Sequence, residues 1–534
     1  MNLSHRIGRV AALIALFPLA AASTWAQGSA HPSATRGAAR ATASAAAQRF
    51  AWRVNALLAQ AQADQASWGI LVVDAGTGEK FYAHNEAKLF GPASNLKLFT
   101  TALALATLGP GYRFRTTLET QGALDNDGRL EGDLLLVGRG DPDLSNRKFP
   151  FVSKAETDGP PEKALAELAD GLVARGIRDI TGDIVADDSY FPPERYPPGW
   201  EMDDAVWQYG AAVSAIAVDD NTALLTLTPG ASEGETVSTE VEPETDDFAV
   251  ENDVATGPPL APSTGAATDQ NDDLALTRDP GERLVVVSGT LPAGSPPRTL
   301  VLAIEHPAEH AAAMLKRLLE ERGVEVEGEA RARHTQEQGS GTPTVLAQHL
   351  SPSLDETVQP VNKLSLNLHA EMLLRAAARA NGPWTKLEEL TDFAQRFYRA
   401  AGIADNDLFF TDGSGLSRSD LVTPRAVVTL LRYARRQPWF PAYFASLPVA
   451  GEDGTLAERM KGTRAAGRVH AKTGSHEHAA ALSGYAEIPG GREFVFSILA
   501  NNAASARDAA NTIDAICAAL FGEPGRRPKK QKPG

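Results

Sequence analysis

The middle of this 534-residue chain has a different local pattern from its two ends. Residues 112–348 contain short apolar runs separated by turns, of which 132–137 and 180–185 are examples, and this pattern is typical of strands. Both flanks contain longer helix-like segments. The pattern predicts one or two β-rich modules inside the chain. At about 150 residues per domain the length corresponds to three or four domains, or to one fold interrupted by insertions.

The first 26 residues have the pattern of a secretory signal. Arg6 and Arg9 precede a 13-residue apolar stretch, and Ala26 is a small residue at which cleavage can occur. A membrane anchor is the alternative, but no apolar run reaches the length of about 18 residues that a bilayer span needs. We therefore expect export to the periplasm or another extracytoplasmic cell-wall space. Residues 27–48 are rich in small and polar side chains and predict a disordered linker.

Charge and cysteine content exclude several classes of protein. Lysine and arginine number 51 against 67 acids, a net charge of −16, which argues against nucleic acid as a partner. The single cysteine, Cys517, cannot form an internal disulfide or a cysteine-rich zinc site. Residues 231–273 contain 12 acids and no lysine or arginine, which favours a flexible surface loop over an acidic interaction site. The basic tail, 524–534, lacks an apolar face, so membrane contact is at most peripheral.

A first candidate site opens a predicted helix that begins near Pro92 and ends at Gly109. Its sequence is Ser94-Asn-Leu-Lys97, and a spacing of three on a helix places the lysine amine beside the serine hydroxyl. An amine that is partly desolvated can be neutral near pH 7 and accept the hydroxyl proton. The spacing alone is weak evidence, because a second copy, Ser145-Asn-Arg-Lys148, stands in a polar loop.

Two further motifs follow in the second half of the chain. Ser365-Leu-Asn367 precedes a predicted helix that ends at Ala380, and its hydroxyl and amide can face one cleft, although helix capping by Ser365 is the alternative. Lys472-Thr-Gly-Ser475 lies on a predicted edge strand. There the lysine can meet a carboxylate and the glycine can let a substrate lie close, although an exposed lysine before a turn is the alternative.

Together, in this order, the three motifs resemble the signature of penicillin-binding proteins and serine β-lactamases. Within that superfamily the chain resembles the D-alanyl-D-alanine carboxypeptidase/endopeptidase family of class C low-molecular-mass penicillin-binding proteins. The catalytic domain of that family is interrupted by a large insertion between the first two motifs. Further stretches that resemble the family are 138–144, 187–191, 207–211, 411–417, 447–451 and 453–456.

The resemblance implies a mixed α/β (α+β) catalytic domain of the DD-peptidase/β-lactamase type, with an antiparallel five-stranded sheet flanked by helices. This domain would be discontinuous, comprising 49–111 and 349–523, with one or more β-rich domains inserted at 112–348. No metal and no cofactor is implied. The implied roles are Ser94 as acylated nucleophile, Lys97 as its base, Ser365 as proton relay, Asn367 as substrate-amide contact, Lys472, Thr473 and Ser475 as carboxylate contacts, and the backbone N–H groups of Ser94 and Ser475 as oxyanion hole.

The activity implied is that of a secreted serine peptidase that hydrolyses D-Ala-D-Ala ends and D-amino-acid crosslinks of peptidoglycan stem peptides. β-Lactam antibiotics would be covalent inhibitors. A serine β-lactamase and a catalytically silent peptidoglycan-binding protein are the alternatives. The sequence leaves the oligomeric state open.

The chain departs from the family at 475–478, where Ser-His-Glu-His replaces the common Thr-Leu continuation. His476 and His478 alternate as on a strand, but no third ligand is evident, so we expect no metal site there. The same holds for His306 and His310, because Pro307 between them fits a helix start.

Overall fold

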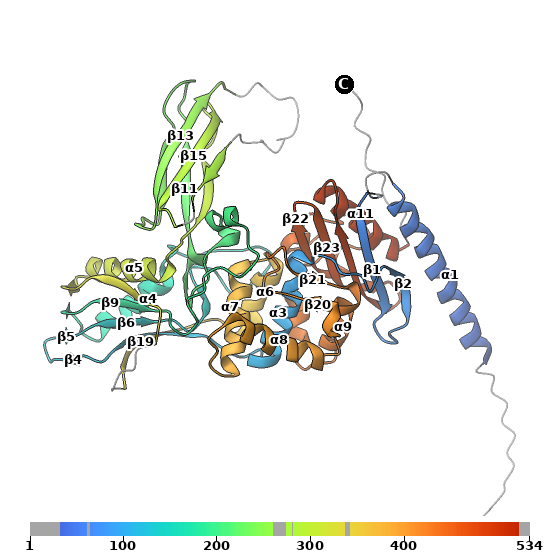
Figure 1. Cartoon of the computed structure of the whole chain (residues 1–534), viewed down its shortest axis with the longest axis horizontal. Helices are drawn as coiled ribbons and strands as arrows, with labels where there is room; N and C mark the ends of the chain where they lie inside the picture. Colours follow the sequence, from blue (N-terminus) through green and yellow to red (C-terminus); the bar gives the residue numbers. More distant parts are fainter. Residues whose placement is uncertain are drawn as a thin grey trace, which may run out of the picture. The chain divides into compact units, whose positions relative to one another are not determined.

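The computed structural model describes residues 33–522 except 61, 62, 64, 260–273, 280 and 337–341 (Figure 1). Met1–Gln48 forms one unit and Arg49–Gly534 another. The predicted signal segment, 1–26, and the basic tail, 524–534, lie outside the described residues. Helix α1 (Ser33–Leu58) begins inside the segment predicted as a disordered linker. The structure differs from the prediction here because alanine, abundant in this segment, has the highest helix propensity of all residues. Within the described ranges, no helix combines the length and apolarity of a membrane span.

One sheet combines strands from the two distant ends of the second unit. It is antiparallel and five-stranded, in the order β2-β1-β24-β23-β22, which confirms the expected catalytic sheet. Its strands are β1 (Ser67–Asp74), β2 (Lys80–His84), β22 (Val469–His476), β23 (Ala479–Ile488) and β24 (Arg492–Asn501). Strand β22 is the last strand of this sheet and lies next to β23, so the Lys-Thr-Gly motif lies on an edge strand as predicted.

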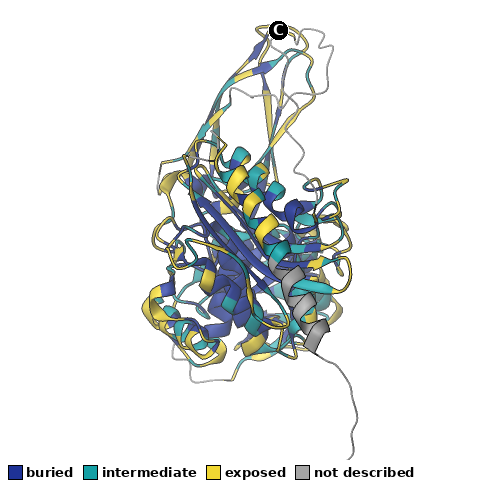
Figure 2. Ribbon diagram, turned by 90° about the vertical axis from the view of Figure 1, so that its right-hand side faces the viewer, coloured by how far each residue is buried: buried dark blue, intermediate teal, exposed yellow. Residues whose placement is uncertain are grey.

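Both faces of this sheet are covered, which explains why its three central strands, β1, β24 and β23, are buried on both sides (Figure 2). Leu71 and Val73 of β1 face one hydrophobic core, and the alternate residues Ile70 and Val72 face a second core. The first core contains α3 (Lys97–Leu108), α6 (Leu354–Lys363), α7 (Asn367–Ala380), α8 (Leu387–Ala400), α9 (Pro424–Ala434) and α10 (Phe440–Ala445). The second contains α11 (Ala506–Leu520) together with Phe50 and Val54 of α1.

The inserted segment contains two modules with separate cores. The first module combines a five-stranded sheet, β18-β9-β6-β3-β19, and a four-stranded sheet, β17-β8-β5-β4, with two helices. The strands of the five-stranded sheet are β3 (Arg115–Thr120), β6 (Leu134–Val137), β9 (Ile184–Asp187), β18 (Ala330–Arg333) and β19 (Thr344–Leu350). The remaining elements are β4 (Ala123–Leu124), β5 (Arg129–Glu131), β8 (Asp179–Ile180), β17 (Glu325–Val326), α4 (Lys163–Ala174) and α5 (Pro307–Glu321). Pro307 is the first residue of α5, as predicted.

The second module is made of two three-stranded sheets, β12-β11-β16 and β13-β15-β14. Its strands are β11 (Thr222–Thr228), β12 (Ser238–Glu242), β13 (Ala249–Gly257), β14 (Ala275–Thr277), β15 (Leu284–Pro292) and β16 (Arg298–Ala303). The prediction of a flexible acidic loop over 231–273 is therefore wrong for 238–242 and 249–257, which form β12 and β13, while 260–273 lie outside the described residues. The physical reason is alternation: Val241 of β12 and Val250 and Val254 of β13 pack into the module core, and most of the acids face water.

Five short elements lie where residues 112–348 meet α7. They are the parallel strands β7 (Asp141–Leu144) and β10 (Ile216–Val218) and the 3₁₀ turns η2 (Met202–Val206), η3 (Gln208–Gly210) and η4 (Asp219–Asn221). Phe191, Ala211 and Val213, which belong to residues 112–348, join the first core. This segment is thus packed against the helices of that core.

Candidate active site

Ser94 lies on a single 3₁₀ turn, η1 (Ala93–Leu96), and α3 begins at Lys97. The predicted helix is confirmed, because α3 ends at Leu108 with Gly109 after it. Lys97 Nζ lies 3.0 Å from Ser94 Oγ. The spacing of three therefore has the expected effect, although the serine occupies the 3₁₀ turn and not the α-helix itself.

The Lys97 amine is completely buried. Besides Ser94 Oγ, its Nζ donates to Asn367 Oδ1 at 2.6 Å and to the backbone oxygen of Ser414 at 2.7 Å. Burial lowers the pKa of Lys97 to about 7, while the charges of Asp412 and Glu371 act in the opposite direction. A substantial fraction of the amine is therefore neutral near pH 7 and able to accept a proton.

Ser365 lies in the three-residue connection between α6 and α7, in the left-handed region with φ of 66°. The residue at the N-cap of α7 is Leu366, so the alternative of helix capping by Ser365 is wrong. Its hydroxyl oxygen instead accepts a hydrogen bond from Lys472 Nζ at 2.9 Å. Asn367 opens α7, and its Nδ2 donates to the backbone oxygen of Tyr209 in the insertion at 2.8 Å. The second motif thus contacts the first through Asn367 and the third through Ser365.

Lys472 on β22 is as buried as Lys97, so the alternative of an exposed lysine before a turn is wrong. Burial holds its pKa well below the usual range, and the nearby charge of Lys97 acts in the same direction. Its backbone oxygen accepts from Asn95 Nδ2 at 3.0 Å, which joins β22 to η1. The Lys472 side chain contacts the hydroxyl of the predicted relay, and its second bond goes to the Thr473 backbone oxygen at 3.0 Å.

Gly474 has a role that the sequence did not predict. A Cβ at this position would lie 2.7 Å from the Pro92 backbone oxygen and 3.2 Å from Ala93 Cβ. The glycine is therefore required for the packing of β22 against η1, and the close approach of a substrate at this position stays a prediction. Ser475, which follows it, is exposed, and Thr473 Oγ1 donates to Thr455 Oγ1 at 2.8 Å.

The turn at 411–417 contributes residues that sequence reasoning had identified only by resemblance. Asp412 accepts hydrogen bonds from the backbone N–H groups of residues 415–417 and from Trp200 Nε1, which fixes the turn. Glu371 of α7 accepts from the backbone N–H groups of Gly413 and Ser414. An aspartate before Gly-Ser-Gly is a turn signal, but the group that meets Lys97 is a backbone carbonyl, which no side-chain pattern reveals.

The four histidines weighed as metal ligands do not form shared sites. His476 Nε2 lies 3.1 Å from the Gly415 backbone oxygen, and His478 Nδ1 lies 3.0 Å from that of Ala503. His306 pairs with Asp247, and His310 pairs with Thr245. Among the described residues, the group whose ligand atoms are close enough to share an ion is Glu201, Asp203 and Asp204 on and beside η2, and it includes none of the predicted site residues.

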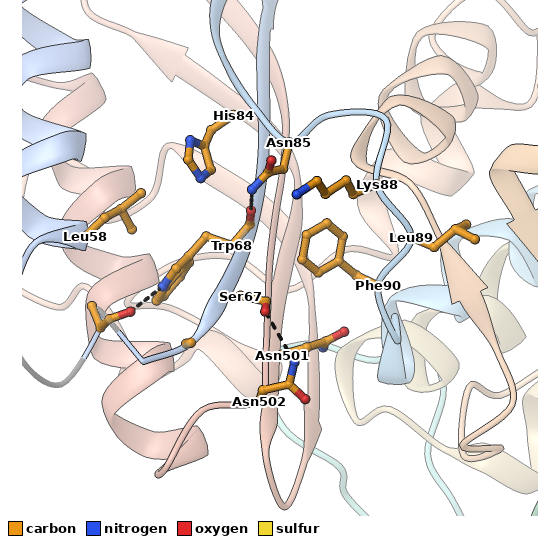
Figure 3. A pocket seen from close by; sticks show the side chains of 12 residues that line it. Leu58, Ser67, Trp68, His84, Asn85, Lys88, Leu89, Phe90, Asn501 and Asn502 are labelled. Atoms are coloured by element: carbon orange, nitrogen blue, oxygen red, sulfur yellow. Dashed lines mark hydrogen bonds between the residues drawn. The ribbon is translucent and has the colours of Figure 1, made fainter.

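The second Ser-x-x-Lys copy has no helix to align it, as expected, because Ser145 and Lys148 follow β7 in an irregular segment and Lys148 is exposed. A cavity of about 390 Å³ lies elsewhere, beside β1 and residues 84–90 (Figure 3). None of the predicted site residues lines it. Its Asn501 accepts from the backbone N–H of Gly91 at 2.7 Å and so supports the segment that leads to Ser94.

The chain is similar to known proteins in both sequence and fold. Residues 51–520 match the model of the D-Ala-D-Ala carboxypeptidase 3 (S13) family. A D-alanyl-D-alanine carboxypeptidase of Actinomadura sp. (strain R39) is 35% identical over 465 residues, which cover 84% of this chain and 80% of that protein. The D-alanyl-D-alanine carboxypeptidase DacB of Haemophilus influenzae is 28% identical over 77% of this chain and 81% of its own. The crystal structure of penicillin binding protein 4 (dacB) from Haemophilus influenzae superposes with a TM-score of 0.73 at 25% identity, covering 86% of this chain and 97% of that one.

Proposed function

Because the chain belongs to the D-Ala-D-Ala carboxypeptidase 3 (S13) family and is a serine-type D-alanyl-D-alanine carboxypeptidase, we propose that Ser94 is its nucleophile. The observation that carries this proposal is the 3.0 Å contact between Ser94 Oγ and Lys97 Nζ, an amine that is buried and partly neutral at pH 7. A serine hydroxyl becomes reactive only when a base removes its proton. In the second Ser-x-x-Lys copy, Ser145 and Lys148 lie in an irregular segment after β7, so no helix aligns the two side chains.

In acylation, neutral Lys97 takes the proton of Ser94 as Oγ attacks the carbonyl carbon of the penultimate D-alanine. The backbone N–H groups of Ser94 and Ser475 would bind the oxyanion, and the close packing of β22 against η1 at Gly474 supports this pairing. Ser365 would then pass a proton to the leaving amine. The C–N bond breaks, free D-alanine departs, and an ester on Ser94 remains. Water attacks this ester, its proton returns through the same groups, and the shortened stem peptide is released.

Substrate would lie along the edge strand β22. Asn367 offers its side-chain amide to a substrate amide, and the hydroxyls of Thr473 and Ser475 lie on the less buried part of the motif, where a terminal carboxylate can reach them. The buried amine of Lys472 would complement the negative charge of that carboxylate. Its contact with Ser365 Oγ gives it a second role in the proton network, which the resemblance alone did not imply.

Three finer properties belong to the same proposal. The sequence of residues 1–26 supports export to the periplasm or another cell-wall space. Penicillin would acylate Ser94 in place of the peptide, because its lactam carbonyl presents the same electrophile. Hydrolysis of D-amino-acid crosslinks would use the same groups, with a longer leaving amine. The complete set of motif residues counts against a catalytically silent wall-binding protein.

The test uses the purified protein and a stem peptide ending in D-Ala-D-Ala. We expect release of D-alanine, measured by mass spectrometry, and stoichiometric labelling by a fluorescent penicillin. Ser94→Ala should abolish both without loss of folding, because Ser94 is part-exposed and the change opens no core cavity. Undiminished labelling of the alanine variant would overturn the nucleophile assignment. Rapid turnover of penicillin would instead favour a β-lactamase, and digestion of crosslinked wall peptides would reveal endopeptidase action.

A further inference from the structure

Glu371 on α7 is a buried acid outside the three motifs, with 1% of its surface exposed. Its Oε1 accepts from the backbone N–H of Gly413 at 2.6 Å and of Ser414 at 2.8 Å. Its Oε2 accepts from Arg375 Nη1, one helical turn later, at 3.0 Å. With these partners the carboxylate is held in one orientation although it is removed from water.

The two residues held by Glu371 are also held by α3 from the opposite side. Thr100 Oγ1 donates to the Gly413 backbone oxygen at 2.6 Å, and Lys97 Nζ donates to that of Ser414 at 2.7 Å. A Cβ at Gly413 would lie 3.1 Å from the Ala370 backbone oxygen, so the turn is also packed tightly on α7. Glu371 therefore acts on Lys97 through one residue, Ser414. The N–H group of Ser414 donates to Glu371, and its carbonyl oxygen accepts from Lys97.

Other charged groups surround this pair. They are Arg375 on α7, Asp412 on the turn, Arg418 and Asp420 just after it, Glu194 beside Arg375, and Lys472 on β22; His476 on β22 is a further titratable group, whose pKa burial lowers to about 4. Burial holds the pKa of Asp420 well above its usual range, so this acid is protonated and can donate to Asp412. Arg375 neutralises part of the acid charge. Burial, together with the charge of Asp412, raises the pKa of Glu371 to about 7, while Arg375 and the backbone N–H groups of Gly413 and Ser414 act in the opposite direction. Above this pH Glu371 is negative, and with Asp412 it favours the protonated form of Lys97.

We propose that Glu371 is a positioning residue for the catalytic amine: it holds the Ser414 carbonyl on Lys97 Nζ, and its negative charge supports the protonated amine that forms when Ser94 loses its proton. The inference rests on the proposed role of Lys97 as base. It gives α7 two functions, since the first turn of this helix presents Asn367 and its second turn presents the counter-charge.

The experiment measures the rate constant for acylation by a fluorescent penicillin between pH 5 and 9. Glu371→Gln keeps an oxygen acceptor but removes the charge that Glu371 carries as it ionises around pH 7, so the acid limb of the profile should move to lower pH by up to about one unit. Glu371→Asp keeps the charge, so its limb should stay at the wild-type pH even where its rates fall. Glu119→Gln is the matched control, because Glu119 is also a buried acid paired with an arginine, Arg139, but lies in the insertion. Its profile should equal that of the wild type.

A glutamine variant whose rate falls equally at every pH, with the limb unmoved, would overturn the proposal and leave Glu371 a purely structural residue. That outcome leaves the role of Lys97 intact, whereas near-normal acylation by Lys97→Arg would remove the premise itself. If Glu371→Gln does not fold, Glu371→Gln/Arg375→Met replaces it, because removal of both charges leaves no unpaired ion in the core. The same downward shift is then expected, and an unmoved limb again refutes the charge effect.

Discussion

Oδ1 of Asp220 lies 2.7 Å from Nε2 of His369, and this contact joins the insertion to the helix that carries Asn367. Asp220 Oδ2 also accepts from Arg147 Nη2 at 2.8 Å. Burial alone would raise the pKa of Asp220, but Arg147 and His369 hold it below its usual range. The turn that presents Asp220 is strained, because Asp219, Asp220 and Asn221 have φ of 46°, 57° and 55°. Strain at three successive residues persists where the surrounding contacts require it.

The first prediction concerns this contact. Asp220→Asn should lower the free energy of unfolding by about 3 kcal/mol, because Arg147 and His369 lose a buried carboxylate partner. Asp219→Asn is the matched control, since it makes the same change one residue earlier and asparagine tolerates the left-handed region. It should change stability by less than about 1 kcal/mol. Urea denaturation at pH 7 measures both, and equal stabilities of the two variants would contradict the role of Asp220.

The second prediction concerns the base. Lys97→Arg keeps a positive charge but cannot accept a proton near neutral pH, so acylation by penicillin should slow by about 10² to 10⁴-fold. Lys148→Arg, the same change in the second Ser-x-x-Lys copy, should leave the rate unchanged because Lys148 is exposed in the insertion. Stopped-flow labelling compares them. Acylation by Lys97→Arg at nearly the wild-type rate would show that Lys97 only places a charge beside Ser94.

The third prediction separates two roles of Lys472. Lys472→Ala should lower kcat/KM for a peptide ending in a free carboxylate by about ten- to a hundredfold, because a charge-assisted contact is lost. For the same peptide with a neutral terminal amide the loss should be smaller. Steady-state kinetics on the two peptides supply the comparison. Equal losses would assign Lys472 to the proton network through its 2.9 Å contact with Ser365 Oγ, and not to carboxylate binding.

The fourth prediction follows from the pKa of about 7 of Lys97 in the folded protein, against 10.5 when unfolded. Between these values the unfolded chain binds a proton that the folded chain does not, so this residue makes the free energy of unfolding rise with pH. The cost of burying the charge is fully present below pH 7 and disappears above pH 10.5.

Lys97→Met removes this effect, so the variant should gain most relative to the wild type below pH 7. The gain should shrink between pH 7 and 10 by at most about 1.4 kcal/mol per pH unit. Chemical denaturation at several pH values provides the measurement. A difference between variant and wild type that does not depend on pH would mean that Lys97 keeps its ordinary pKa in the fold.

Much of the candidate site could be predicted because its motifs are local. Ser94 and Lys97 need only a spacing of three on a helical turn, and Lys472 needs only an edge strand, so a short window of sequence contains the necessary geometry. The antiparallel five-stranded sheet was likewise expected, from the resemblance that these motifs carry.

Composition was a poorer guide than alternation. The acidic segment was predicted as a loop because its charges were counted together, but Val250 and Val254 of β13 pack in the module core while Glu251 and Asp253 between them are exposed. A strand places successive side chains on opposite faces, so a charged segment can still build a core.

The sequence by itself determined which residues carry the three motifs, which elements hold them and which superfamily the chain resembles. Only the tertiary structure decided that Lys97 meets Asn367 and the Ser414 carbonyl, that Lys472 meets Ser365, and that Asp220 of the insertion holds α7. These partners are separated by between 107 and 317 residues along the chain. Periodicity and propensity act over a few residues, whereas such contacts depend on how whole helices and strands pack. A backbone carbonyl is present in every residue, so the residue type at position 414 does not predict its contact with Lys97.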